Sequence, residues 1–184
     1  MKVEVPANYK GITLECFVNY KQATNDYDRL MAICNITEDE AKAIPVSEAQ
    51  DIIQLFEDTL LYESADFQRT IYVGSQEFGF IPNLKKMSLA EYVDISAFAK
   101  DLHKNAISLM AIFYRPITKK VGNKYLIEDY SSKTRELNEE LVKTMNLEQL
   151  NGALLFFSTL TRDFKATSLE FLEKTLNEMQ KANA

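Results

Sequence analysis

The residues between Phe78 and Ile117 constrain the fold more than any other part of the chain. Ser88 is placed to cap a helix, and apolar residues then recur at helical spacing as far as Phe113. Pro116 disfavours helical backbone in the residue before it and has no amide donor, so the helix should end near Arg115. We therefore expect a central helix over about residues 88–113, with a wide apolar face made by Leu89, Tyr92, Val93, Ala97, Leu102, Ile107, Leu109, Met110 and Phe113.

The rest of the chain predicts more helices and little sheet. Only 5 Gly and 4 Pro occur in 184 residues, so few breaks interrupt the elements. Polar residues that can cap a helix precede several apolar stripes, at Thr13, Asn25 or Asp26, Thr37, Ser47, Ser131 or Ser132, and Asn146. Residues 2–5 suit a short strand, and Gly74-Ser75 and Gly122-Asn123 are typical hairpin turns. The predicted class is mainly α with minor β (α+β), with one or two small β-hairpins packed on the central helix.

The chain is long enough for one domain with a sizeable core. We expect residues 1–184 to form a single domain, which could consist of an N-terminal helical lobe over 12–63 and a C-terminal lobe over 65–180 that share a core. The last helix is predicted from Leu147 to about Gln180, with Gly152 allowing another helix to approach. One sequence shape recurs in Ile12-Thr13-Leu14-Glu15, Met87-Ser88-Leu89-Ala90 and Met145-Asn146-Leu147-Glu148, with a looser copy in Val46-Ser47-Glu48-Ala49. It is interpreted as a helix cap behind an apolar residue; an ancient duplication is the alternative.

Charge and cysteine content exclude several classes of function. The formal net charge of −6 and a pI near 5.0 oppose binding to a phosphate backbone, so we expect no nucleic-acid partner. Cys16 and Cys34 form no metal-binding or redox motif and are expected to be reduced core residues. No segment is apolar and long enough for a targeting signal or a membrane span, which favours a cytoplasmic protein without membrane contact.

Motifs that carry enzyme chemistry are not found in this sequence. His103 is the only histidine, which argues against a zinc site, and it is expected to be structural rather than catalytic. The carboxylates are distributed as on solvated helix faces, and no glycine-rich phosphate loop or nucleophile elbow occurs. We therefore predict a protein that is not an enzyme, with no catalytic residue, no cofactor and no metal.

Aromatic residues gather instead on the turns and hairpins around the central stretch. We predict a partner-binding surface there, because tyrosine and arginine are typical anchors of protein interfaces. The alternative is that these side chains only close the core between sheet and helix. The predicted surface consists of Phe78, Phe80, Pro82, Asn83, Tyr114, Arg115 and Tyr125.

Two groups of segments resemble proteins of tailed phages. Residues 12–14, 28–40 and 44–47 resemble the helical front end of small tailed-phage proteins grouped with tail and baseplate assembly chaperones. Residues 81–84, 87–94 and 114–117 resemble a protein that recurs in phage structural-gene clusters. The resemblance spans about residues 12–127 and brings over no catalytic residue. It implies a helper that binds phage tail or baseplate proteins, in the host cytoplasm during assembly.

Three functions follow as hypotheses. The first is a non-enzymatic morphogenesis protein of the assembly-chaperone type, which acts by protein–protein contacts. The second is a minor structural protein of the virion, such as a connector or a baseplate or tail subunit, which would be found in the particle. The third, remote, is a small cytosolic enzyme. The residues specify neither the client nor the oligomeric state.

Overall fold

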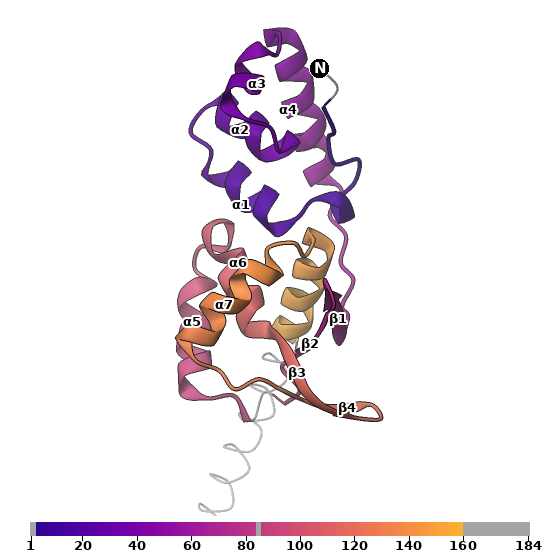
Figure 1. The fold of residues 1–184 in the computed structure, drawn as a ribbon, viewed down its shortest axis with the longest axis vertical. Helices are drawn as coiled ribbons and strands as arrows, with labels where there is room; N and C mark the ends of the chain where they lie inside the picture. Colours follow the sequence, from indigo (N-terminus) through magenta and orange to yellow (C-terminus); the bar gives the residue numbers. More distant parts are fainter. Residues whose placement is uncertain (1–2, 84–85, 160–184) are drawn as a thin grey trace, which may run out of the picture.

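The computed structural model describes residues 3–83 and 86–159, and Figure 1 shows an elongated molecule with two halves. Four helices form the first half: α1 (Leu14–Gln22), α2 (Asp26–Cys34), α3 (Glu38–Ala43) and α4 (Val46–Leu61), preceded by the 3-10 turn η1 (Tyr9–Gly11). The second half holds α5 (Leu89–Phe98), α6 (Leu102–Phe113), α7 (Ser132–Val142) and a further helix over 147–159. Helix α1 packs on α6 and joins the halves.

One antiparallel sheet lies in the second half. Its strands are β1 (Thr70–Val73), β2 (Gln76–Phe80), β3 (Tyr114–Val121) and β4 (Lys124–Ile127), in the order β1-β2-β3-β4. Two hairpins supply it, and at their turns Gly74 and Gly122 adopt φ of 58° and 57°, which glycine tolerates best. The predicted class, mainly α with minor β, and both predicted hairpins are confirmed.

Most of the predicted caps begin their helices. The side chains of Thr13, Asn25, Thr37 and Ser131 each accept a hydrogen bond from the backbone amide three residues later. Asn146 does the same for the last helix, with its Oδ1 2.9 Å from the amide of Gln149. The prediction for Ser47 is wrong: α4 begins at Val46, so Ser47 lies inside the helix, and no side chain caps the helix start. The strand predicted over 2–5 is also not found in the part that the structure describes, residues 3–5.

The predicted central helix consists of two helices. Helix α5 ends at Phe98, and Asp101 then caps α6 by accepting a hydrogen bond from the amide of Lys104 at 3.3 Å. Asn105 reaches back 3.4 Å to the carbonyl of Phe98. This break has no glycine or proline, so a side-chain cap within an otherwise helical pattern produces it. The helical end agrees with the expected one: α6 ends at Phe113, and Arg115 and Pro116 belong to strand β3.

Two of the segments of shared shape, 12–15 and 145–148, pair with each other where the halves meet. Thr13 and Asn146 form an antiparallel β-bridge. The amide of Leu14 donates to Met145 O at 2.7 Å, and the amide of Leu147 donates to Ile12 O at 3.0 Å. The apolar residues on both sides of the two caps are buried. The buried side chains of both halves form one core cluster around this bridge.

At Gly152 the last helix packs on a loop rather than on another helix. A Cβ there would lie 2.4–2.5 Å from backbone atoms of Asp66 and Phe67, so the close approach is confirmed but its partner is the 66–67 segment. The amide of Asp66 donates to Glu148 O at 3.1 Å in the same contact. The remainder of this predicted helix, residues 160–180, lies outside the described residues.

Candidate functional site

The seven residues of the predicted partner surface are mostly in the core. Phe78, Phe80, Tyr114, Arg115 and Tyr125 are buried, whereas Pro82 and Asn83 are exposed. The five buried residues therefore do not form an exposed surface, and packing between sheet and helices accounts for them. Whether a partner binds at this end of the molecule stays a prediction.

Tyr125 illustrates how closely these residues pack. Its ring lies over Gly79 of β2, where a Cβ would be 2.4 Å from the ring carbon Cε2. Its hydroxyl lies 2.7 Å from Phe80 O and 3.1 Å from Arg69 O. Burial raises the pKa of the Tyr125 hydroxyl above its usual value. Tyr125 is therefore a structural residue that ties β4 to the strand on the far side of β3.

The exposed members of the set border a cleft of about 400 Å³, which we call the α5 cleft. Pro82 and Asn83 form one rim, Ser88 at the start of α5 lines another side, and the buried Glu91 and Arg115 line its inner part. Residues 126–130, which run from the end of β4 toward α7, also line it. The structure thus brings three of the seven predicted residues together: Pro82, Asn83 and Arg115.

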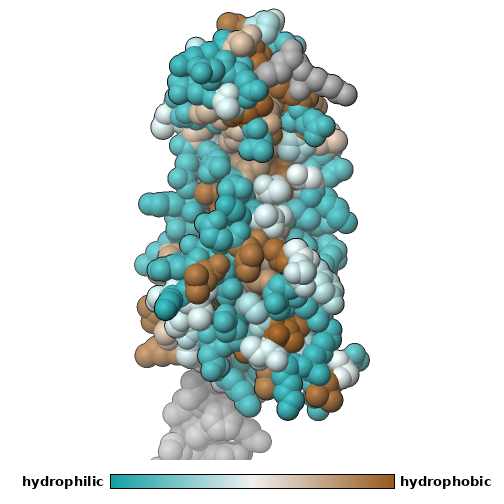
Figure 2. Space-filling model, in the orientation of Figure 1, coloured by the Kyte–Doolittle hydropathy of each residue, from teal (hydrophilic) through white to brown (hydrophobic). Residues whose placement is uncertain are grey.

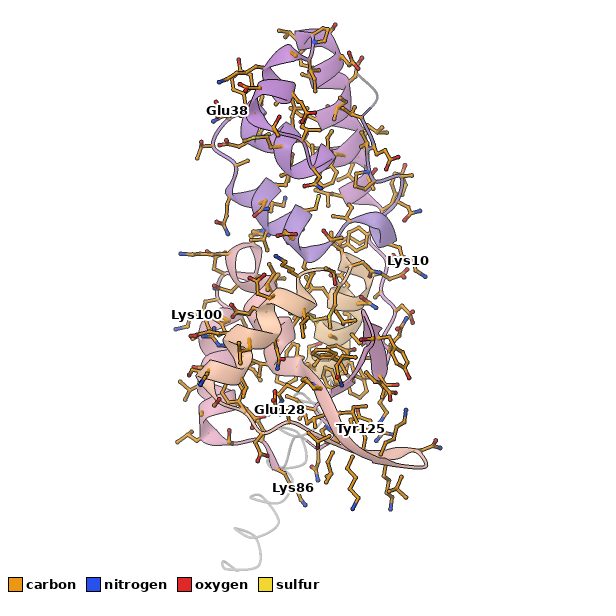
Figure 3. The ribbon with its side chains drawn as sticks, in the orientation of Figure 1. Lys10, Glu38, Lys86, Lys100, Tyr125 and Glu128 are labelled. Atoms are coloured by element: carbon orange, nitrogen blue, oxygen red, sulfur yellow. The ribbon has the colours of Figure 1, made fainter. Side chains whose placement is uncertain are left out.

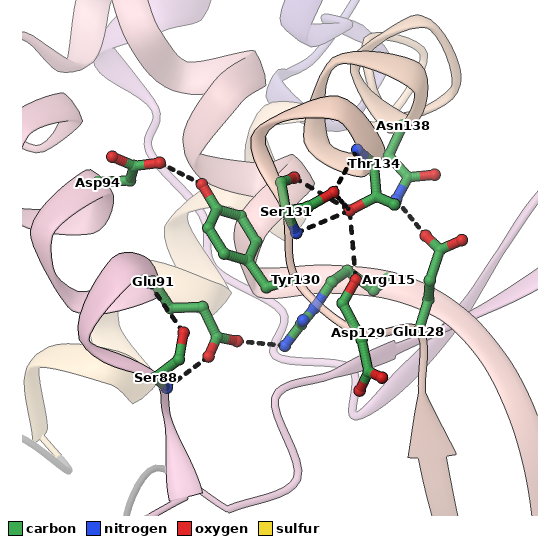
Figure 4. Close-up of polar contacts among 10 residues, drawn as sticks. All are labelled: Ser88, Glu91, Asp94, Arg115, Glu128, Asp129, Tyr130, Ser131, Thr134 and Asn138. Atoms are coloured by element: carbon green, nitrogen blue, oxygen red, sulfur yellow. Dashed lines mark hydrogen bonds and ion pairs between the residues drawn. The ribbon is translucent and has the colours of Figure 1, made fainter.

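An ion pair between Arg115 and Glu91 lies at the base of the α5 cleft (Figure 4). Both side chains are buried, and Glu91 also accepts a hydrogen bond of 2.6 Å from the amide of Ser88 in a capping box. Burial lowers the pKa of the Arg115 guanidinium, and Glu91 offsets part of this effect by favouring the charged form. The Nε of Arg115 is buried without a hydrogen-bond partner among the described residues.

More polar contacts connect this ion pair to the neighbouring elements. The Tyr130 hydroxyl donates to Asp94 of α5, and the Tyr130 ring lies 5.8 Å from the Arg115 guanidinium. Asn138 of α7 is buried and donates to Glu128 at 3.2 Å, as Figure 4 also shows. Burial, followed by the hydrogen bond to Asp94, raises the pKa of the Tyr130 hydroxyl well above its usual value. The network holds α5, β3 and α7 in one arrangement.

The charge of the α5 cleft is unsuited to an anionic ligand. Arg115 and Lys86 face Glu91, Glu128 and Asp129 along its walls, so the acidic groups outnumber the basic ones. The guanidinium that could bind an anion is already paired with Glu91.

Over residues 3–83 and 86–159, no group of three His, Cys, Asp or Glu residues could hold a metal ion. His103 does not line the cleft; it is exposed on α6, with its ring 5.7 Å from that of Phe17.

Beside the cleft, α5 exposes apolar side chains that the sequence predicted to be buried. Leu89, Tyr92 and Val93 are 77%, 56% and 52% exposed, whereas Glu91 and Ile95 face inward. We call Leu89, Tyr92 and Val93 the α5 outer face. Sequence reasoning missed the inward carboxylate: the Ser88–Glu91 spacing of a capping box indicates the hydrogen bond to the Ser88 amide, but not the burial of Glu91. The outer face is an apolar surface in contact with water.

Comparison of the chain with protein-family models, with curated proteins and with solved structures gives no match. Within the described residues, no helix has the length and apolar character that crossing a membrane requires. The site must therefore be interpreted from its own geometry.

Proposed function

We propose that this protein is not an enzyme and acts by protein–protein contacts, with the α5 outer face as its contact surface. The observation that carries the proposal is the orientation of α5. The helix turns Glu91 into the core and leaves Leu89, Tyr92 and Val93 in water. Neighbouring large apolar residues on one exposed helix face are typical of surfaces that a partner covers.

The buried ion pair supports this interpretation, because it fixes which side of α5 faces outward. Glu91 is held by both Arg115 and the amide of Ser88, so rotation of α5 about its axis would leave a buried charge unpaired. Pro82 and Asn83, on the adjacent rim of the α5 cleft, extend the contact surface. A partner would meet a preorganised apolar face bordered by the acidic wall of the cleft.

The resemblance to phage proteins suggests the class of partner. Our proposal is that the clients are tail or baseplate proteins of a tailed phage, bound in the host cytoplasm during assembly. In this role the protein would shield apolar client surface until the client is incorporated. No chemical step is required, which agrees with an α5 cleft whose only buried cation is already paired.

Co-purification tests the proposal with a matched pair of variants. We expect Val93→Asp to reduce co-purification with co-expressed tail or baseplate proteins at least about tenfold, because it places a charge within the apolar contact. Val46→Asp makes the same change on an exposed valine at the start of α4 and should leave co-purification unchanged. Both variants should melt like the wild type, since both side chains are already largely in water.

Two outcomes would contradict the proposal. Equal co-purification by Val93→Asp and wild type would exclude the α5 outer face, and the lack of any tail or baseplate protein in the wild-type sample would exclude the client class. Proteomics of purified particles then separates the two assembly roles. An assembly chaperone should be missing from the particle, whereas a minor structural subunit should be present.

A further inference from the structure

The charges of this protein are divided unequally along the chain. Residues 12–63, which contain α1–α4, carry 3 basic and 11 acidic side chains, a net charge of −8. The remaining residues carry 18 basic and 16 acidic side chains, a net charge of +2. The molecule is therefore strongly acidic at one end only, and the elongated shape in Figure 1 separates that end from the β3–β4 hairpin.

The β3–β4 hairpin presents a face that is both basic and apolar. In its register Lys119 is opposite Leu126, and Val121 is opposite Lys124. Opposed residues of an antiparallel pair share a face, and so do residues two apart in one strand. These four side chains therefore lie together on one face, which we call the hairpin face.

The hairpin face is open to water. Val121 and Leu126 are 69% and 60% exposed, and both lysines are exposed. Lys120, on the opposite face, is paired with Glu77, but neither Lys119 nor Lys124 has an ion pair among the described residues. The hairpin and its side chains project from the end of the molecule in Figure 3. Two aliphatic side chains and two unpaired cations thus lie side by side.

A groove of complementary character lies between α4 and residues 7–10. It has a volume of about 590 Å³, and we call it the α4 groove. Leu55 of α4 and Tyr62, the residue after this helix, are exposed along it, while Tyr9 and Thr59 are buried. Figure 2 shows mostly hydrophilic residues on the visible side of this half, with hydrophobic residues in small patches between them.

Acidic residues border the α4 groove. Asp58 lies between Leu55 and Tyr62 on the same face of α4, and Asp51 continues that face one turn earlier. Glu148 lies on the opposite side, where its partner Lys10 is 3.9 Å away. The groove therefore offers an apolar floor with carboxylates at its edges, which is the inverse of the hairpin face.

We propose that the hairpin face of one copy of this protein docks in the α4 groove of a second copy. Val121 and Leu126 would cover Leu55 and Tyr62, while the two lysines meet Asp51 and Asp58. This contact uses neither the α5 outer face nor the α5 cleft, so it is independent of the proposed function. Because the two surfaces are different, a bound pair of copies keeps one free hairpin face and one free α4 groove, so the contact continues into a ring or a filament.

Sedimentation velocity on the full chain tests this inference. The weight-average mass should rise with protein concentration at low ionic strength and fall toward that of the monomer in about 0.5 M NaCl, where screening is strong. Lys119→Glu/Lys124→Glu should raise the Kd of self-association at least about a hundredfold, because like charges then oppose each other. Lys100→Glu/Lys133→Glu makes the same change in net charge at exposed lysines away from the hairpin and should leave the Kd unchanged.

A charge exchange identifies the two surfaces. Asp51→Lys/Asp58→Lys should abolish self-association as the hairpin variant does, and an equimolar mixture of the two variants should associate again. Asp58→Asn with the wild-type hairpin serves as the milder test if the double groove variant melts early. A wild type that stays monomeric at all concentrations overturns the inference. So does association that neither pair of substitutions weakens, or a mixture of well-folded variants that fails to associate.

Discussion

Arg115 stands in strand β3 with its guanidinium beside Glu91 of α5, and both side chains are nearly out of contact with water. Removing two charges from water costs several kcal/mol each, and their attraction offsets this only while both partners are present. The pair therefore adds little to stability by itself. Its effect is to make one orientation of α5 much better than the others, which places Leu89 and Val93 outside.

Replacing one member of this pair should be more harmful than replacing both. We expect Arg115→Met to lower the free energy of unfolding by about 3–5 kcal/mol, because Glu91 is left buried without its counter-charge. The double variant Arg115→Met/Glu91→Gln should recover part of this loss, since glutamine keeps the capping hydrogen bond without the charge. Urea denaturation measures each free energy.

An exposed ion pair provides the control. Arg29 lies 3.3 Å from Asp26 on α2 with both side chains well exposed, and Arg29→Met should cost about 0–1 kcal/mol. If Arg115→Met is as mild as Arg29→Met, the pair does not have the buried character that the structure gives it, and the argument for the orientation of α5 is lost.

At the scale of elements, the contact between the last helix and residues 66–67 depends on one missing side chain. Gly152 has no room for a Cβ, because the atoms it would meet belong to the backbone of Asp66 and Phe67 and cannot rotate away. The amide of Asp66 donates to Glu148 O next to this position. The connection between α4 and β1 is thereby held against the helix that begins at 147.

Gly152→Ala should destabilise the protein, although alanine is the better helix former. Helix propensity alone predicts a gain of about 1 kcal/mol, but overpacking against backbone should outweigh it and give a net loss of about 1–3 kcal/mol. Gly11→Ala is the control, since its Cβ would be 3.6 Å or more from any neighbour. Thermal melting of the two variants compares them, and an increase in Tm for Gly152→Ala would contradict the packing described here.

Across the whole molecule, burial favours the neutral forms of several tyrosine hydroxyl and cysteine thiol groups. Burial, followed by the hydrogen bond to Glu57, raises the pKa of Tyr20 to about 12, and burial raises the pKa of Cys16 to about 12. The pKa of Tyr114 is raised further, again mainly by burial. These groups lie in both halves, so their effect on stability concerns the shared core.

Stability should therefore decline at alkaline pH. The folded pKa values lie above those of the unfolded chain, so the unfolded state loses its protons first as the pH rises past about 9–10. The contribution of these groups is complete below that range and is lost as the pH rises toward 12. The urea midpoint should be the same at pH 7 and pH 8 and clearly lower at pH 11. A midpoint that does not fall between pH 8 and pH 11 would show that these side chains are not buried.

The sequence by itself determined the class of fold and most of the local boundaries. A cap such as Thr37 and a turn such as Gly122-Asn123 act through hydrogen bonds and dihedral angles of residues only a few positions apart. Their signals are therefore complete within short windows. The same holds for the shared shape at residues 12–15 and 145–148, whose caps the sequence predicted correctly.

Only the tertiary structure decided which faces are buried and which segments meet. Helix α5 is apolar on most sides, so its pattern could not show that Glu91 faces inward, because the reason is an arginine 24 positions away. The bridge between Thr13 and Asn146 and the contact of Gly152 with Asp66 likewise join distant parts of the chain. Burial and counter-charge are properties of the assembled core. The aromatic residues of the predicted partner surface are therefore inside, and apolar residues of α5 that were predicted to be core are outside.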